Sequence, residues 1–261
     1  ETRTGLHLCN RGRAGFSLTR EGERFYQYVQ ELFSAMSNFS SNVNLLHTKI
    51  TGEINIGITD NFVTHEQMII TNMITLLRQK IPGIKVNLQM KPSQEIEIDV
   101  INNKYDIGVV QLEKSSPCLE YYPLYHESEL LYCAEGHPLF HHGEAITLEE
   151  IYQQPAVKSS ATQNVDWNNF NISASSADRE STAFLILSGC YIGFLPQFYA
   201  QQFVAAGRMR ALRHPEMVNE IEYKMIIKRS NINNLIIEYW LKLYQRVTGF
   251  TTGGNSRQKL G

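Results

Sequence analysis

Polar and charged side chains follow several predicted strands, at the points where those strands end. These groups are Thr59, Asp60 and Asn61; Lys91, Pro92 and Ser93; Lys158, Ser159 and Ser160; and Phe194 with Pro196. In open α/β sheets, ligands bind in the crevice outside the carboxyl ends of the strands. Helix N-termini and lysines favour an anionic or carbonyl-bearing ligand there, whereas Asp60 favours a ligand with a hydrogen-bond donor. The same residue types also serve in ordinary loops and helix caps, so both interpretations stay open for each position.

A basic turn lies near the start of the chain, in the segment NRGRAGFSLTREG (10–22). Arg11 and Arg13 flank a glycine and could place guanidinium groups on the phosphates beside a DNA groove. The alternative is a solvated turn that caps the following helix. The formal net charge of −2 excludes a generally basic protein, so any contact with nucleic acid must come from such a local patch.

The sequence carries no recognisable catalytic or metal-binding pattern. His65 and Glu66 begin an H-E-x-x-H motif, but Ile69 stands where the second histidine belongs. A nucleophile elbow, a P-loop and a dinucleotide fingerprint are also missing. We therefore expect no enzymatic activity, no cofactor and no bound metal. Four widely spaced cysteines indicate a reduced, cytoplasmic protein, and the lack of a long apolar run predicts no membrane partner.

Apolar residues recur after Thr19 at alternating steps of four and three, the spacing of a coiled-coil seam. They are Phe25, Val29, Leu32, Met36, Phe39, Val43, Leu46 and Ile50. Thr19 is a suitable N-cap, and Thr51 with Gly52 is a plausible stop. The pattern predicts a long helix that dimerises through this seam. The alternative is a helix packed on its own domain, although such helices usually carry a wider apolar stripe.

The chain after Gly52 alternates between strand-like and helix-like segments. Strands are predicted at 52–59, 84–90, 105–110, 130–134, 156–159, 191–195 and 222–227. Helices are predicted from a capping box at Thr64 to before Pro82, and at 94–102, 148–153, 179–188 and 235–247. This alternation is typical of βαβ units with a parallel sheet. We expect two α/β lobes, with the last helix returning to the first lobe.

Several stretches in this order resemble LysR-type transcriptional regulators. CNRGRAGFSLTREGERF (9–25) is similar to the family's wing, and the heptad helix resembles its linker helix. Five further segments resemble the effector domain of the family: GEINIGIT (52–59), LRQKIPGIKVNL (77–88), YDIGVV (105–110), EGHPL (135–139) and GCYIGFLP (189–196). Cys9 and Tyr191 depart from the usual Phe and Gly of the family pattern. The resemblance covers roughly residues 4–248.

The resemblance implies an α/β fold with a two-lobed, periplasmic-binding-protein-like (type II) effector domain behind a winged helix-turn-helix. Most of the helix-turn-helix is expected before Glu1. The expected divisions are the wing remnant 1–19, the linker helix 20–51, effector subdomain I at 52–126 and 228–248, subdomain II at 127–227, and a disordered tail 249–261.

The resemblance also implies function and partners. A small effector would bind between the lobes and re-set a homodimer or homotetramer on DNA, with RNA polymerase as a further partner. The rival prediction is a solute-binding protein of a transport system, which shares the two-lobed fold. The basic turn and the heptad seam disfavour that rival, since a transport receptor needs neither.

Overall fold

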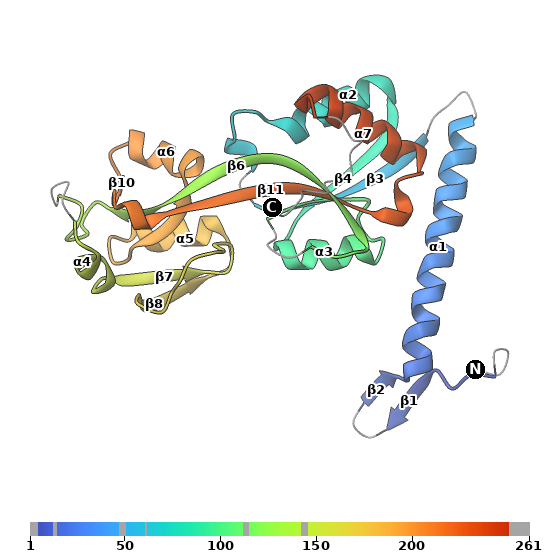
Figure 1. Ribbon diagram of the computed structural model, residues 1–261, viewed down its shortest axis with the longest axis horizontal. Helices are drawn as coiled ribbons and strands as arrows, with labels where there is room; N and C mark the ends of the chain where they lie inside the picture. Colours follow the sequence, from blue (N-terminus) through green and yellow to red (C-terminus); the bar gives the residue numbers. More distant parts are fainter. Residues whose placement is uncertain are drawn as a thin grey trace, which may run out of the picture.

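The protein begins with a short hairpin and a long helix, and two α/β lobes follow (Figure 1). The computed structural model describes residues 5–12, 15–46, 51–60, 62–111, 115–141 and 146–250. The hairpin strands are β1 (Cys9–Gly12) and β2 (Gly15–Leu18), and the helix is α1 (Arg20–Leu46). Thr19 caps α1 as predicted, because the backbone N–H of Gly22 donates to its hydroxyl oxygen at 2.9 Å. A Cβ at Gly22 would lie 1.9 Å from the Leu8 carbonyl oxygen, so only glycine allows hairpin and helix to approach this closely.

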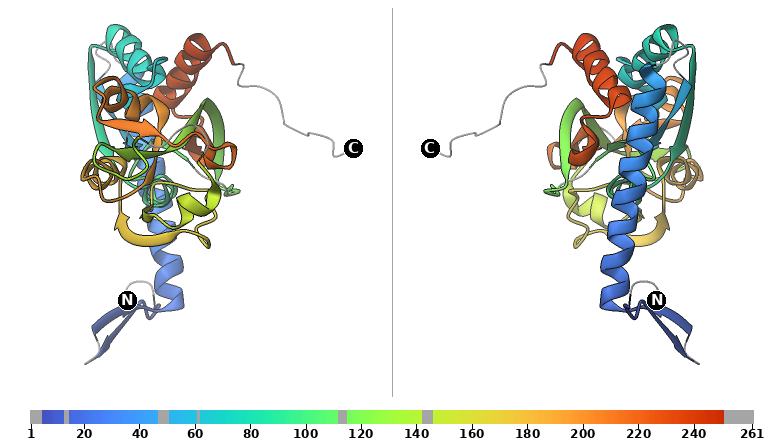
Figure 2. Two further views of the ribbon diagram at one scale, coloured as in Figure 1. Left: turned by 90° about the vertical axis from the view of Figure 1, so that its left-hand side faces the viewer. Right: turned by 90° about the vertical axis from the view of Figure 1, so that its right-hand side faces the viewer.

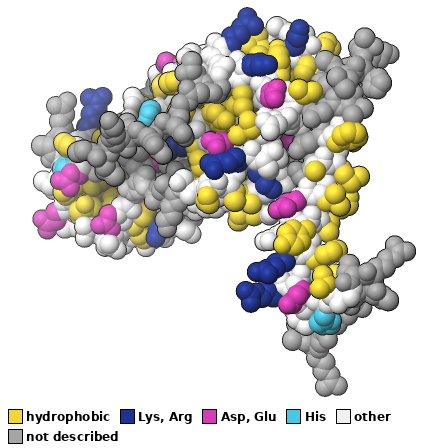
Figure 3. Space-filling view, turned by 45° about the vertical axis from the view of Figure 1, so that its right-hand side comes forward, with side chains coloured by type: hydrophobic (Ala, Val, Ile, Leu, Met, Phe, Trp, Pro, Cys, Tyr) yellow, Lys and Arg dark blue, Asp and Glu magenta, His cyan; other side chains and the backbone are white. Residues whose placement is uncertain are grey.

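Helix α1 extends away from both lobes and carries the hairpin at its far end (Figures 1 and 2). Of the predicted seam, Leu32, Met36 and Phe39 are 59%, 56% and 70% exposed. Phe25 and Val29 are half-buried. The apolar side chains gather along the projecting helix in Figure 3. The side chains of Val43 and Leu46, and the whole of Ile50, lie outside the described residues.

Lobe I is built on three parallel strands, with β3 between β4 and β5. Its elements are β3 (Thr51–Ile58), α2 (Ile69–Lys80), β4 (Gly83–Met90), α3 (Ser93–Ile101), β5 (Ile107–Val110) and α7 (Leu235–Thr248). Helices α2 and α7 pack on one face of the sheet around the fully buried Trp240, and α3 packs on the other face through Ile96 and Val100. The alternating isoleucines of β3 therefore point into the α2 and α7 side, as their period of two predicts.

The predicted capping box at Thr64 is wrong. Residues Phe62–Thr64 form a 3-10 turn (η1), and α2 begins five residues after Thr64. His65 is buried and its ring stacks on Tyr125 with centroids 3.6 Å apart. Because this contact holds His65 against the lobe, the chain turns there and does not continue as a helix. Met68, in the left-handed region at φ 43°, then starts α2 without a side-chain cap.

Two long antiparallel strands connect the lobes. They are β6 (Leu119–Ala134) and β11 (Val218–Lys228). In lobe I β11 pairs antiparallel with β5, and in lobe II β6 pairs antiparallel with β9 and β10. Among the described residues these seven strands form one mixed sheet. The prediction of parallel pairing thus holds for β4, β3 and β5 and, outside this sheet, for β7 (Pro155–Ser159) with β8 (Asn171–Ser176). It is wrong for the other strands of the mixed sheet, because the crossing strands run in opposite directions and impose antiparallel pairing on their neighbours.

Lobe II packs helices and short strands around the far ends of β6 and β11. Its elements are α4 (Leu148–Tyr152), β7 (Pro155–Ser159), β8 (Asn171–Ser176), α5 (Arg179–Leu187), β9 (Gly193–Pro196), α6 (Gln197–Ala205), β10 (Met209–Ala211) and the 3-10 turn η2 (Pro215–Met217). A further 3-10 turn, η3 (Arg229–Asn231), leads from β11 back into lobe I. Strands β8 and β10 and helix α6 were not predicted. Pro196 occupies the N-cap position of α6, so this proline begins a helix where the sequence indicated only the end of a strand.

The crossing strands belong to both lobes. The register of their pairing shifts between Tyr223 and Lys224, whose partners are Tyr125 and Pro123, which leaves Leu124 as an extra residue at the crossing. We propose the division between subdomains I and II at this crossing, close to the predicted boundary at 126/127. No helix in the described part of the chain combines the length and the apolar character needed to cross a membrane.

Candidate functional site

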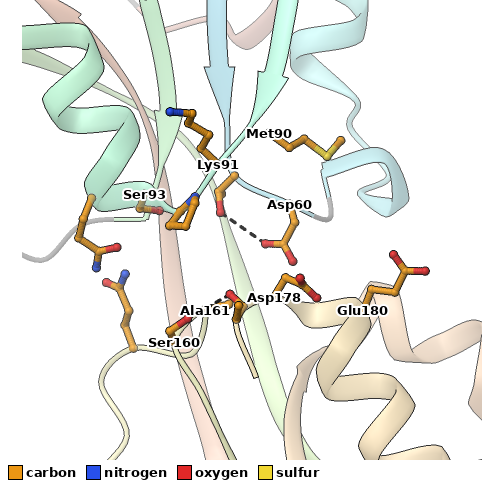
Figure 4. A pocket seen from close by; sticks show the side chains of 13 residues that line it. Asp60, Met90, Lys91, Ser93, Ser160, Ala161, Asp178 and Glu180 are labelled. Carbon is orange, nitrogen blue, oxygen red and sulfur yellow. Dashed lines mark hydrogen bonds between the residues drawn. The ribbon is translucent and has the colours of Figure 1, made fainter. Parts of the chain in front are cut away.

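A cavity of about 340 Å³ lies between the two lobes (Figure 4). Lobe I lines it with Thr59, Asp60, Met90, Lys91, Pro92, Ser93 and Gln94. Lobe II lines it with Ser160, Ala161, Gln163, Ala177, Asp178 and Glu180. A cavity of this size admits a small metabolite.

Strand pairing places the lobe I residues at the cavity. Ile58 and Met90 are register partners at the ends of the parallel strands β3 and β4, so the residues that follow them emerge side by side. The N–H of Lys91 donates to the Ile58 carbonyl at 3.1 Å and fixes this arrangement. Helix α3 begins at Ser93, whose hydroxyl oxygen accepts from the N–H of Gln111 at 3.1 Å.

Six of the sequence-predicted ligand residues line this cavity. They are Thr59, Asp60, Lys91, Pro92, Ser93 and Ser160. Asn61 lies outside the described residues. Each of the six follows the end of a strand or begins a helix, which is why the strand-end rule found them.

The other four predicted residues do not line the cavity. Lys158 is exposed on β7, and the hydroxyl oxygen of buried Ser159 accepts the N–H of Ala161 at 3.3 Å. Phe194 packs in the core of lobe II, and Pro196 pairs with Glu129 across β9 and β6. Lys158 and Phe194 lie inside their strands, where side chains alternate between core and solvent, whereas Ser159 and Pro196 are the last residues of β7 and β9.

A buried arginine joins the lobes at the wall of the cavity. Arg179, the first residue of α5 in lobe II, is 2% exposed. Its Nη1 donates to Asp60 Oδ1 at 2.5 Å and its backbone N–H donates to Asp60 Oδ2 at 2.7 Å. Its Nη2 donates to the Tyr223 hydroxyl at 3.0 Å and to Gln111 Oε1 at 3.2 Å. Arg179 thus links α5 to the residues that follow β3 and β5 and to the crossing strand β11.

This arginine is shared by more than one carboxylate. Glu129 on β6 is fully buried and lies 3.4 Å from Arg179 Nη2, and its other oxygen accepts from Asn219 Nδ2 at 2.9 Å. Burial raises the pKa of Glu129, and burial raises the pKa of neighbouring Glu127 to about 7. Asp60 is the third carboxylate. The guanidinium therefore faces more carboxyl groups than its single charge can neutralise.

Lys91 does not bring its charge into the cavity. Its Nζ lies 2.9 Å from Asp99 Oδ2 and 3.4 Å from Glu95, and Lys104 contacts the same Asp99 oxygen at 3.2 Å. The hydrogen bond to Asp99 raises the pKa of Lys91. Figure 4 shows the side chain directed away from Asp60. The sequence-based expectation that Lys91 attracts an anionic ligand is therefore not supported by its position.

Sequence reasoning missed Arg179, Glu127 and Glu129. The sequence identifies Arg179 only as the first residue of a predicted helix. The signal for the glutamates was their spacing. Glu127, Glu129 and Leu131 alternate along one strand and therefore share a face, and the apolar Leu131 indicates that this face is buried. A carboxylate on such a face needs a cationic or hydrogen-bonding partner. Within the described ranges, no group of three His, Cys, Asp or Glu side chains is arranged to hold a metal ion.

Comparison with known proteins gives this arrangement a family. Residues 47–247 match the LysR substrate binding domain. The chain is 40% identical over 247 residues to the HTH-type transcriptional activator BauR of Pseudomonas aeruginosa, covering 93% of this chain and 81% of BauR. The chain belongs to the LysR family of transcriptional regulators. The family resemblance drawn from the sequence is confirmed.

Other members of the LysR family share the fold at lower identity. The HTH-type transcriptional regulator CrgA of Neisseria meningitidis is 24% identical over 219 residues, covering 80% of this chain and 71% of CrgA. The structure of CrgA aligns with a TM-score of 0.59 at 19% identity, covering 94% of this chain and 85% of CrgA. Full-length AphB of Vibrio cholerae aligns with a TM-score of 0.62 at 18% identity, covering 95% and 86%. The predicted two-lobed fold is confirmed, and this LysR-type regulator carries an effector-binding domain.

Proposed function

We propose that the cavity between the lobes binds the small-molecule effector of this regulator. The observation that supports this is the Arg179–Asp60 contact, in which the two lobes meet at the cavity wall. A ligand that fits one lobe arrangement better than another shifts the equilibrium toward it. Occupancy of the cavity would change the position of Asp60 relative to α5 and so bias lobe closure.

The proposed ligand contacts come from both lobes. Helix α3 starts after Pro92 without a side-chain cap, so its first backbone N–H groups are available to a carbonyl or carboxylate oxygen of the ligand. The hydroxyls of Thr59 and Ser160 and the side chain of Gln163 add hydrogen-bonding groups.

The relatives are named as transcriptional regulators, which are not enzymes, and we propose the same for this chain. They also favour a regulator over a solute-binding protein.

We propose that α1 pairs with a second copy of the chain through the heptad seam. The exposure of Leu32, Met36 and Phe39 supports this, because covering each such side chain stabilises an assembly by roughly 1.5–3 kcal/mol. A homodimer or a homotetramer would bury the apolar side chains of the seam. Lobe rearrangement in one copy would then alter the relation between two α1 helices.

We further propose that the hairpin contacts DNA phosphates in the assembled regulator. Arg11 lies on β1, and Arg13 falls outside the described residues. The position of the hairpin at the far end of α1 supports this proposal, because it separates any DNA contact from the lobes (Figure 1). RNA polymerase is a further proposed partner, and the cytoplasm is the proposed location.

The effector proposal is tested by blocking the cavity. A metabolite panel is screened by thermal shift, since a ligand of the folded state raises the melting temperature. The dissociation constant of each hit is then measured for Ser160→Phe, which fills the cavity from an exposed loop, and for Ser173→Phe on exposed β8 as the matched control. We expect the dissociation constant to rise about tenfold or more only in Ser160→Phe. Equal binding by both variants would place the effector site elsewhere.

A further inference from the structure

The walls of the cavity carry an excess of carboxylates. Its ionisable lining residues are three acids, Asp60, Asp178 and Glu180, and one base, Lys91. The Lys91 ammonium is engaged by Asp99 and Glu95 and points away. The described lining thus presents acidic groups without an opposing cation.

The two acids on α5 differ in their engagement. Asp178 caps the helix, with Oδ1 accepting the N–H of Ser181 at 2.7 Å, and lies at the cavity edge. Glu180, in the first turn, is exposed, and its carboxylate has no hydrogen-bond or ion-pair partner among the described residues. Glu180 is therefore available to a cationic group in the cavity.

Asp60 occupies the hydrogen-bond donors at the start of α5, where lobe II could otherwise bind an anionic group of the ligand. Its carboxylate accepts both the first backbone N–H of α5 and the Arg179 guanidinium. A ligand carboxylate arriving at this end of α5 would find those donors used. It would also meet the charge of Asp60 itself, which disfavours a second anion at short range.

The buried groups behind the wall do not reverse this balance. Arg179 is the cation of that network, and Asp60 and Glu129 both contact it, with Glu127 close by. A single guanidinium shared in this way leaves no surplus positive charge to attract an anion into the cavity. The field at the α5 side of the cavity is therefore negative or neutral.

We propose that the effector carries a protonated amine, which lies at the α5 side of the cavity against Asp60, Asp178 and Glu180, and that Asp60 makes the site reject an anionic group there. This inference rests on the proposed effector site. It leaves the uncapped start of α3 for a carbonyl or carboxylate group at the opposite end of the same ligand.

The test uses the full chain and matched ligands. Straight-chain compounds of about three to six carbons, sizes that a cavity of about 340 Å³ admits, are compared as ω-amino acids, alkylamines and alkanoates. We expect thermal shifts from amine-bearing compounds and none from the alkanoate of equal length. Each hit is located by its loss in Ser160→Phe.

Charge removal then tests the acidic wall. Glu180→Gln should raise the dissociation constant of an amine-bearing hit roughly two- to fivefold, and added salt should reduce the difference. Glu149→Gln is the matched control, because Glu149 is an exposed acid in the first turn of α4 and lies outside the cavity lining. Asp178→Asn, which retains a capping side chain, should add a similar effect.

The outcomes separate this inference from the proposed site. An alkanoate that binds in the cavity as tightly as its amine counterpart, or equal affinities for Glu180→Gln and Glu149→Gln, would overturn the amine and keep the effector site. Amine binding that Ser160→Phe does not weaken would overturn both. The absence of any thermal shift across the three series would overturn the amine inference and leave the effector site to the metabolite panel.

Discussion

Replacing Arg179 tests the link between the lobes most directly. Arg179→Met keeps an unbranched apolar stem and removes the guanidinium, which leaves Asp60 without its guanidinium partner and Glu129 without its nearest cation. Removing one partner of a buried ion pair costs about 3–5 kcal/mol. We expect a loss of this size in the free energy of unfolding, measured by urea titration. Arg229→Met is the comparator, because Arg229 pairs with Glu120 at the surface and such pairs contribute at most about 1 kcal/mol.

The pH dependence of Arg179→Met sharpens this prediction. The Arg179 charge lowers the pKa values of Glu127 and Glu129, so both rise further in the variant. A carboxyl group whose folded pKa is raised costs stability as the pH rises above its unfolded value of 4.5. The destabilisation should therefore be smaller at pH ~5 than at pH ~8, and Glu129→Gln in the same chain should recover part of it. A loss no larger than that of Arg229→Met, independent of pH, would refute the reasoning.

Three further predictions concern the buried glutamate, the seam and the core. Glu127→Gln should flatten the pH dependence of the free energy of unfolding. The folded pKa of Glu127 is about 7 against an unfolded value of 4.5, so the parent chain loses up to about 3 kcal/mol as the pH rises through that window. An unchanged slope would contradict this. Phe39→Glu should shift the chain toward monomer in sedimentation velocity, whereas Gln27→Glu, off the seam, should not. Trp240→Ala should lower the free energy of unfolding by about 3–5 kcal/mol in a urea titration, since the side chain is fully buried against α2 and the sheet.

Local patterns in the sequence determined much of this molecule. The heptad spacing and the cap at Thr19 predicted α1, and the alternating isoleucines of 52–59 predicted β3 and its buried face. The strand-end rule identified Thr59, Ser93 and Ser160 as neighbours although they come from different parts of the chain. These inferences succeed because periodicity, capping and strand ends depend on residues close together in sequence.

Only the tertiary structure decided the charge of the site and the joining of the lobes. Arg179 and Asp60 are 119 residues apart, and no local pattern relates them. The sequence placed Lys91 at the crevice but could not tell that Asp99 would draw its ammonium away. The antiparallel crossing of β6 and β11, and the turn that His65 imposes before α2, likewise depend on distant partners. Backbone periodicity is set by neighbours along the chain, whereas the pairing of buried charges is set by which segments the fold brings together.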